Sequence, residues 1–115
     1  MPKIFRISEI EKNFTPRGTS THVFVDDKDN ASMAAGVVYF KDSDVDFKLW
    51  YDEVMFCLSV EESFSIVVDG VENFMSPGDM MWLPAGTSLI WRSKGTAAAI
   101  FAVTPADWAA RRPTT

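Results

Sequence analysis

Short apolar segments follow one another along most of the chain, and many of them alternate between apolar and polar positions. Alternation of this kind predicts β-strands, because successive side chains of a strand point to opposite faces. Turns that contain charged residues, Gly or Pro separate the segments at intervals of roughly 8–12 residues, which is typical of a sandwich or barrel. The expected strands cover residues 23–25, 36–40, 48–60, 64–68, 71–75, 80–83, 88–91 and 97–103.

Turn and cap signals mark the ends of several segments. Asp69 and Gly70 form the strongest hairpin signal, because a two-residue hairpin turn favours Asp, Asn and Gly. Ser8 followed by Glu11 matches a capping box, which predicts a short helix over residues 9–14. The other expected connections are a charged loop at 26–30, an acidic loop at 42–46 and a helical turn that begins at 105–108.

The composition is that of a globular protein with one core. The chain has 115 residues, of which 47% are hydrophobic and 23% are charged, so a disordered chain is excluded and one domain is expected. We predict a single domain over residues 1–115. It consists of an N-terminal arm over about 1–20, a barrel over about 21–104 and a C-terminal turn over 105–115.

Charge and cysteine usage restrict the partners and the location. No apolar stretch approaches the ~20 residues that span a bilayer, and no apolar segment follows the basic start of the chain. The single cysteine, Cys57, allows no internal disulfide. Eleven basic against sixteen acidic residues give a net charge of −5, which opposes binding to phosphates. We therefore expect a cytoplasmic protein with no nucleic-acid partner and no membrane partner.

Four motifs together resemble one family. They are residues 31–36 (ASMAAG), 51–54 (YDEV), 78–88 (GDMMWLPAGTS) and 105–108 (PADW). The chain is similar to the small single-domain cupins, and specifically to their EutQ-like branch, named for an ethanolamine-utilisation protein. The resemblance implies an all-β fold: a cupin double-stranded β-helix, or jelly-roll barrel, with short N- and C-terminal helical segments. It also implies a small-molecule pocket in the mouth of the barrel and a homodimer.

Most cupins bind a metal through paired histidines, a glutamate and a third histidine. The resemblance places Glu53 on the glutamate position and the third histidine position on Leu89. The paired positions fall on Asp46 and Lys48 or, one residue later, on Phe47 and Leu49. None of these is histidine, whereas a transition metal needs three or four converging ligands. We therefore predict a metal-free protein without a cofactor.

A pocket with one carboxyl group and one phenol remains. If Glu53 points inward, strand alternation turns Tyr51, Met55 and Cys57 inward as well. Burial raises the pKa of a carboxyl group, so Glu53 could serve as a general acid or base, with Tyr51 as the second catalytic residue. Alternatively, Glu53 hydrogen-bonds a backbone N–H or Tyr51 and only holds the barrel mouth. The expected substrate-binding residues are Met55, Leu89, Trp91 and Lys48.

Two functional hypotheses stay open. In the first, the protein is an EutQ-like cupin that binds a small molecule in an apolar pocket, with acid–base catalysis through Glu53 and Tyr51. In the second, it is a non-catalytic accessory protein with a filled barrel that acts through its dimer or a partner surface. An open cavity of ~300 Å³ or more favours the first hypothesis. A mouth plugged by Trp82, Trp91 and phenylalanine side chains favours the second.

Overall fold

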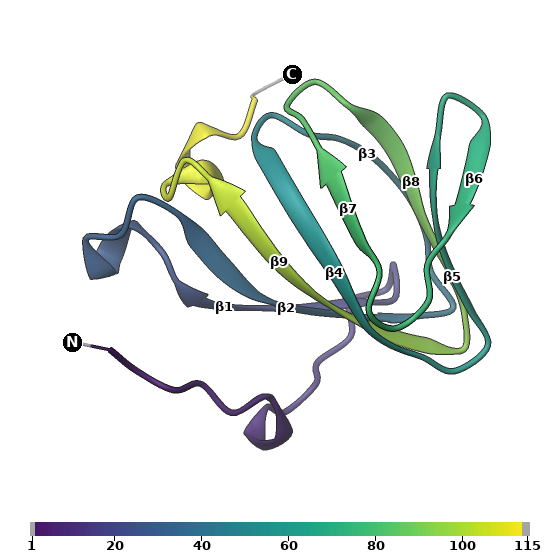
Figure 1. Cartoon of the computed structure of the whole chain (residues 1–115), viewed down its shortest axis with the longest axis horizontal. Coiled ribbons are helices and arrows are strands. Elements are labelled where there is room, and N and C mark those ends of the chain that lie inside the picture. The colour runs from purple at the N-terminus through teal and green to yellow at the C-terminus, as the bar shows by residue number, and fades with distance from the viewer. Residues whose placement is uncertain (1, 114–115) are drawn as a thin grey trace.

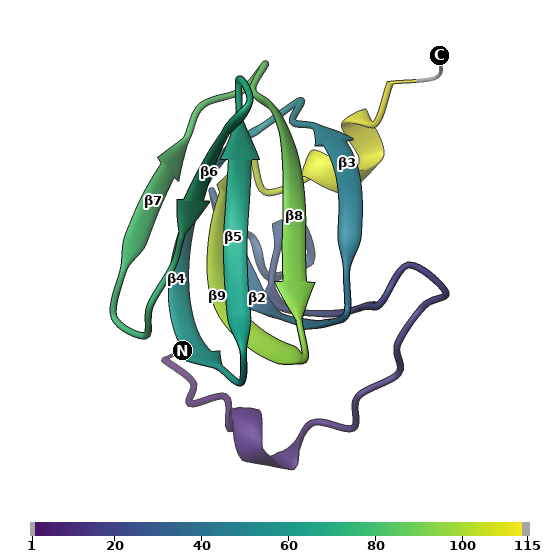
Figure 2. The ribbon, with the colours of Figure 1, turned by 90° about the vertical axis from the view of Figure 1, so that its right-hand side faces the viewer.

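The structure is a computed structural model that describes residues 2–113, and this part of the chain forms nine strands in two antiparallel sheets (Figure 1). The strands are β1 (Thr19–Val25), β2 (Ala34–Lys41), β3 (Asp44–Lys48), β4 (Asp52–Val60), β5 (Ser63–Val68), β6 (Val71–Phe74), β7 (Met80–Leu83), β8 (Ser88–Lys94) and β9 (Thr96–Thr104). One sheet has the order β1-β2-β9-β4-β7 and the other the order β3-β8-β5-β6. Figure 2 shows the second sheet from its outer side, with β5 and β8 at its centre. The predicted all-β class is confirmed.

The apolar core fills the space between the two sheets. Side chains of both sheets meet there, as in the stacked pair of Phe40 from β2 and Phe64 from β5, whose ring centroids lie 4.8 Å apart. Cys57 of β4 is fully buried in this core, in agreement with the inward position that alternation predicts for it. The β5–β6 hairpin also forms as predicted, with Asp69 at φ 51° and Gly70 at φ 76°, the positive values that its turn requires.

The segment predicted as one long strand over 48–60 is two strands in different sheets. β3 belongs to the four-stranded sheet and also takes in most of the predicted acidic loop, whereas β4 belongs to the five-stranded sheet. Residues 49–51 form the corner between them. The Leu49 N–H donates to the Thr87 carbonyl at 2.9 Å, and the Gly86 N–H donates to the Leu49 carbonyl at 2.8 Å. These bonds to a distant loop, which local alternation cannot reveal, redirect the chain.

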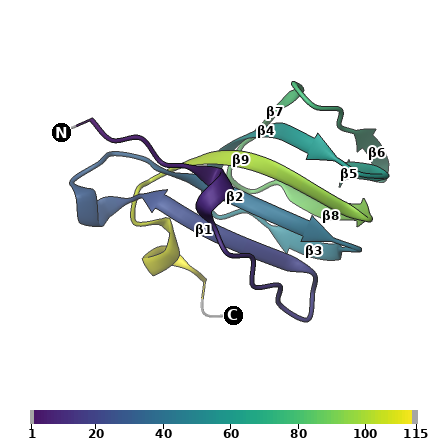
Figure 3. The same cartoon turned by 90° about the horizontal axis from the view of Figure 1, so that it is seen from below.

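The N-terminal arm contains one short 3-10 turn, η1 (Ile7–Glu9), instead of the predicted helix over 9–14. A helix this short is unstable without packing that favours it. Ile7 and Ile10 instead dock on the outer face of β2 against Val37 and Tyr39. Figure 3 shows the arm in purple crossing the sheet over β2. Docking on the sheet therefore determines the path of the arm.

Two further 3-10 segments complete the described part of the chain. They are η2 (Asp27–Asp29), in the predicted charged loop, and η3 (Trp108–Arg111), in the predicted C-terminal helical segment. η3 lies beside the corner at 49–51, where the Trp50 indole N–H donates to the Trp108 carbonyl at 2.7 Å. Within residues 2–113, no helix has the length and apolar character needed to cross a membrane.

Candidate functional site: a cavity at the mouth of the barrel

A cavity of about 240 Å³ lies between the two sheets and opens at the end of the barrel where η3 packs. Its walls are mainly apolar and aromatic, and they come from both sheets. Representative wall residues are Phe40 of β2, Phe47 of β3, Met55 of β4, Trp91 of β8 and Phe101 of β9. The cavity is open, but its volume lies below the ~300 Å³ that favours the small-molecule hypothesis, so volume alone does not decide between the two hypotheses.

Glu53 is the acidic group on this wall. It lies near the start of β4, between Val103 of β9 and Leu83 of β7, and only 4% of its surface is exposed. In the part of the chain that the structure describes, its Oε1 has no hydrogen-bond partner. Burial raises the pKa of this carboxyl to about 8, because desolvation penalises the charged form. The group therefore holds its proton at neutral pH.

Tyr51 lies two residues before Glu53, on the same side of the chain, and lines the same cavity. Its ring packs against Trp50 at 5.0 Å and Trp108 at 5.1 Å between centroids. Burial raises the pKa of its hydroxyl, the neighbouring Glu53 carboxyl adds to the increase, and the Arg112 guanidinium opposes it. The phenol therefore stays protonated and is available as a hydrogen-bond donor.

Trp91 contributes a second polar atom that lacks a partner. The residue lies on β8, where its ring faces Phe47 at 5.0 Å between centroids. Its indole Nε1–H is buried and, among residues 2–113, donates to no hydrogen-bond acceptor. A buried N–H group usually has a hydrogen-bond acceptor, and the residue that carries this one also belongs to the cavity lining.

Two arginines, Arg17 and Arg112, also line the cavity. Local sequence patterns did not reveal either of them as a site residue. Both are exposed, and they come from the segments that precede β1 and follow η3. Arg17 Nη2 donates to the Asp46 carbonyl at 3.2 Å. The Arg112 guanidinium lies over the Trp50 ring, 5.3 Å from its centroid. Only the folded chain brings both residues to the same cavity, because they lie near opposite ends of the sequence.

The structure brings four of the six predicted site residues together: Tyr51, Glu53, Met55 and Trp91 line the cavity. Lys48 and Leu89 do not line it. Lys48 is exposed, and its register partner on β8 is Ser88, so alternation places it on the outside of the sheet. Leu89 is 3% exposed and packs in the core away from the cavity. Both instead border a shallower depression on the four-stranded sheet.

Trp82 does not occupy the position that the filled-barrel hypothesis gives it. It neither plugs the mouth nor packs in the core, because it lies on the edge strand β7 and is 58% exposed. Its register partner on β4 is Val54, the neighbour of inward-facing Glu53, so both side chains belong to the outer face. Strand β7 carries its buried side chain one position later, at Leu83.

A cupin metal centre does not fit these residues. Of the two possible positions for the paired histidines, the structure selects Phe47 and Leu49, because Asp46 and Lys48 are exposed on the outer side of β3. Both selected side chains are apolar, and within residues 2–113 there is no group of three or more His, Cys, Asp or Glu side chains able to hold a metal ion. Glu53 is thus the one family ligand position that retains a metal-ligand side chain.

Comparison with known families supports the fold and the resemblance. The family model described as "Ethanolamine utilisation protein EutQ" matches residues 10–110. A curated relative, the acetate kinase EutQ of Clostridioides difficile strain 630, is 25% identical over 84 residues. The match covers 73% of this chain and 52% of the relative, so the chain spans about half the length of that protein.

Solved structures share the architecture. A candidate ethanolamine utilization protein Q from Salmonella typhimurium LT2 superposes with a TM-score of 0.80 at 20% identity, covering 90% of this chain and 85% of that one. A cupin 2 conserved barrel domain protein from Salinispora arenicola CNS-205 gives a TM-score of 0.70 at 13% identity, covering 96% and 95%. At these identities the likeness concerns the fold, and it confirms the predicted cupin barrel.

Proposed function

Since the chain belongs to the EutQ family of ethanolamine utilisation proteins, we propose that it binds a small organic molecule in its barrel cavity without a metal. In this proposal, protonated Glu53 and Tyr51 donate hydrogen bonds to an oxygen atom of the bound molecule, and Glu53 transfers its proton as a general acid. The observation that carries the proposal is the Glu53 carboxyl, which is 4% exposed on the cavity wall and has an Oε1 without a partner in the described residues.

The energetic argument concerns two polar groups on one wall. Leaving a buried donor or acceptor without a partner costs about 1–3 kcal/mol. In the described part of the chain, Glu53 Oε1 and Trp91 Nε1 both lack partners, and both residues line the cavity. If Glu53 only held the barrel together, its carboxyl would be expected to bond a backbone N–H or Tyr51. A bound molecule with an oxygen atom would satisfy these groups and recover the cost.

The protonation state favours an acid over a base. With its pKa raised to about 8 by burial, Glu53 keeps its proton at pH 7 and can release it to a group that gains negative charge. General acid catalysis is most effective when the pKa of the acid lies near the working pH. Tyr51 supplies a second donor beside it and stays neutral throughout this range.

The cavity volume limits the size of the molecule. A volume of about 240 Å³ equals that of about eight water molecules at ~30 Å³ each. Sites for drug-sized ligands run from ~300 to ~1,000 Å³. A nucleoside triphosphate belongs to the larger class, so we do not assign to this cavity the acetate kinase activity in the name of the relative. The proposed ligand is a small metabolite.

Calorimetric titration with small carbonyl and hydroxyl compounds tests this function. The wild type should bind at least one member of the set, and Glu53→Leu, which removes the buried acid, should lose that binding. Circular dichroism and thermal melts verify that the variant folds, and Glu62→Leu, at an exposed turn position, is the control. If wild type binds no member, or if Glu53→Leu binds as well as wild type, the proposal fails.

A proton-transfer assay tests the catalytic part separately. The bound compound is incubated in D₂O, and NMR follows deuterium incorporation next to its carbonyl group. In this exchange a solvent water removes the proton from the carbon while Glu53 protonates the carbonyl oxygen, and the reverse transfers return a deuteron to the carbon and a proton to Glu53. We expect incorporation with the wild type to decline above pH 8, where Glu53 loses its proton, and to be lost in Glu53→Gln. Incorporation that is equal in Glu53→Gln contradicts the catalytic role and leaves a binding protein.

A second proposed role concerns the outer face of the five-stranded sheet. Met80 and Trp82 on the edge strand β7 are 66% and 58% exposed, and Phe56 and Val54 lie opposite them on β4. An exposed apolar surface beside a sheet edge favours association with another chain. We propose a homodimer through this face, located in the cytoplasm. It could serve an accessory role in addition to the cavity.

A further inference from the structure

We infer that the molecule in the barrel cavity is a small organic anion, whose carboxylate or phosphate group is held at the mouth by Arg17 and Arg112. The inference rests on the proposed function, because it names the class of ligand for the same cavity. Arg17, Arg112, Glu53 and Trp91 all belong to the lining of this one cavity.

Local contacts hold each arginine at the mouth. The turn before β1 is closed by the Gly18 N–H, which donates to the Thr15 carbonyl at 2.9 Å, and Gly18 has φ 83°. Arg17 lies in this turn and also donates to the carbonyl of Asp46. Arg112 follows η3, and its cation is attracted to the face of the Trp50 ring. Both contacts leave other N–H groups of each guanidinium free to bind a ligand.

The charge of this rim favours an anion. Within residues 2–113, Arg92 and Arg111 form ion pairs with carboxylate groups. No carboxylate of these residues lies within 4.0 Å of the Arg17 or Arg112 guanidinium. These two cations therefore keep their positive charge uncompensated by a close carboxylate, in a chain whose net charge is −5. A guanidinium group is well suited to bind carboxylate and phosphate oxygens in a bidentate manner.

The interior of the cavity sets the second requirement. Trp91 Nε1 and the protonated Glu53 carboxyl are hydrogen-bond donors on residues of the cavity lining, so a ligand that carries an acceptor oxygen suits them. A neutral Glu53 also places no negative charge in the cavity that would repel an anion. The chemical class is therefore a carboxylate or phosphate monoester that carries a carbonyl or hydroxyl oxygen and a short apolar body.

Matched pairs of probes test the charge requirement directly. The carboxylate arm compares 2-oxobutanoate with its neutral amide, and the phosphate arm compares dihydroxyacetone phosphate with dihydroxyacetone. Calorimetry gives the dissociation constants for wild type, Arg17→Gln, Arg112→Gln and the double variant. The matched control is Arg92→Gln, which removes an arginine whose carboxylate partners are Asp44 and Glu72, away from the cavity lining.

We expect at least one anion to bind the wild type about ten-fold or more tightly than its neutral partner, because hydrogen bonds to charged groups are the stronger ones. Each single variant should weaken the anion about ten-fold, and the double variant should bind anion and neutral partner equally. Arg92→Gln should keep the wild-type preference. The preference should also fall in 0.5 M salt, because the two arginines are exposed.

Three outcomes overturn the inference, and they separate it from the proposed function. Equal binding of anion and neutral partner to wild type overturns the inference alone and leaves a site for neutral molecules. An anion preference that survives in the double variant overturns the role of the two arginines. If none of the four probes nor any other compound tested binds, the small-molecule proposal fails, and the inference fails with it. Binding in only one arm identifies the anion as a carboxylate or as a phosphate.

Discussion

The two faces of β4 both carry side chains that are unusual for a half-buried strand: the inner face has an acidic residue, and the outer face has apolar residues. The inner face carries a carboxyl group, Glu53, among the apolar residues Met55 and Cys57. The outer face carries Val54, Phe56 and Leu58, of which Leu58 is 39% exposed. Antiparallel strands usually place apolar residues inside and polar residues outside. Here an acid is buried and apolar side chains reach the surface, so neither face is explained by stability of the monomer alone.

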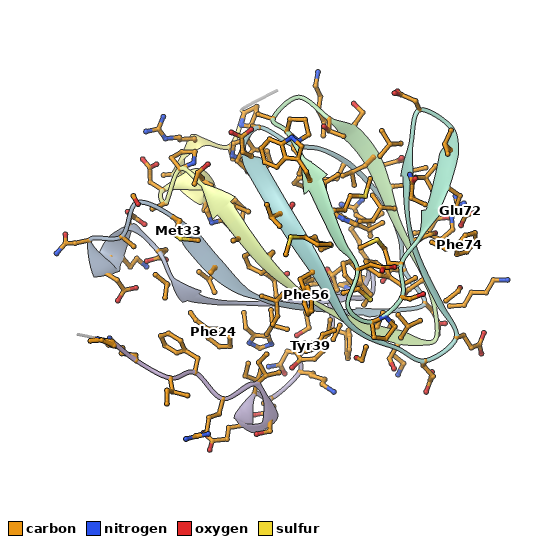
Figure 4. The ribbon with its side chains drawn as sticks, in the orientation of Figure 1. Phe24, Met33, Tyr39, Phe56, Glu72 and Phe74 are labelled. Atoms are coloured by element: carbon orange, nitrogen blue, oxygen red, sulfur yellow. The ribbon has the colours of Figure 1, made fainter. Side chains whose placement is uncertain are left out.

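The register extends the apolar outer face over three strands. Val54 lies between Trp82 of β7 and Ala102 of β9, and Phe56 lies between Met80 and Ile100 in the same way. We call these six residues the outer patch. The arm covers the neighbouring part of the sheet, where Ile7, Ile10 and Phe24 pack on Val37 and Tyr39. Figure 4 shows Phe24 and Tyr39 beside the arm, with Phe56 further along the sheet.

The largest effect is expected from the outer patch. Replacing Phe56 and Trp82 together by Ser should convert a dimer into a monomer, because buried interface aromatics contribute about 2 kcal/mol or more each. Light scattering at micromolar concentration should give wild type a mass near twice 12.9 kDa and the variant a mass near 12.9 kDa. A wild type at the monomer mass would contradict the dimer.

A matched substitution separates the patch from general surface hydrophobicity. Phe74 is an aromatic residue that is 66% exposed, but it lies on β6 in the other sheet. Phe74→Ser should leave the mass near that of the dimer. If this variant dissociates and the double variant does not, the interface lies on the four-stranded sheet instead.

The inner face should respond to pH. The folded pKa of Glu53 is about 8, above the unfolded value of 4.5, so the folded protein retains a proton that the unfolded chain has released. The stability of wild type should therefore fall as pH rises from 4.5 to about 8. Glu53→Gln removes this loss, and its advantage in unfolding free energy should reach on the order of 3–5 kcal/mol at pH 9, since each pKa unit is worth about 1.4 kcal/mol.

Urea unfolding of wild type and Glu53→Gln at pH 5, 7 and 9 gives this advantage as a function of pH. The advantage should be smallest at pH 5, because this pH lies closest to the unfolded pKa of 4.5. There the unfolded chain gains least from releasing the Glu53 proton, which the folded protein retains. Glu62→Gln, at an exposed turn position, serves as the control and should follow wild type. A Glu53→Gln protein that is less stable at all three values would mean that a charged, structural Glu53 had been lost.

A smaller effect is expected from Trp91 on the inner face. Trp91→Phe removes the indole Nε1 but keeps an aromatic ring, so relief of the buried donor partly offsets the lost packing. We expect the unfolding free energy to change by about 1 kcal/mol or less. Binding of a cavity ligand should weaken about ten-fold, as loss of a hydrogen bond predicts. Trp82→Phe, on the outer face, is the control and should not alter that binding.

The smallest effect is expected from Lys48, which lies outside the cavity lining. Lys48→Gln should leave the affinity for any cavity ligand unchanged within error, whereas Arg17→Gln should lower it. Calorimetry on the two variants with the same probe makes the comparison, because each loses one positive charge from an exposed position. A loss of affinity in Lys48→Gln equal to that in Arg17→Gln would show that overall charge, and not the rim, attracts the ligand.

The sequence by itself determined the features that depend on near neighbours. Alternation placed Tyr51, Glu53 and Met55 on one face, and the structure has all three on the cavity wall. The hairpin at Asp69 and Gly70 follows from the backbone freedom of those two residue types. The family motifs predicted the barrel fold, because their turn residues recur at fixed places in that fold.

Only the tertiary structure decided which strands share a sheet and what meets at the mouth. The aromatic run at 49–51 has the alternation and residue types of a strand, yet hydrogen bonds to residues 86 and 87 turn it into a corner. Val45 and Phe47 of β3 face the cavity in the same alternation phase as Tyr51 and Glu53, so Lys48 lies on the outer side. Arg17 and Arg112 both line the cavity because chain segments from both ends pack around it. Contacts between residues far apart in sequence leave no local pattern, so they appear only once the chain is folded.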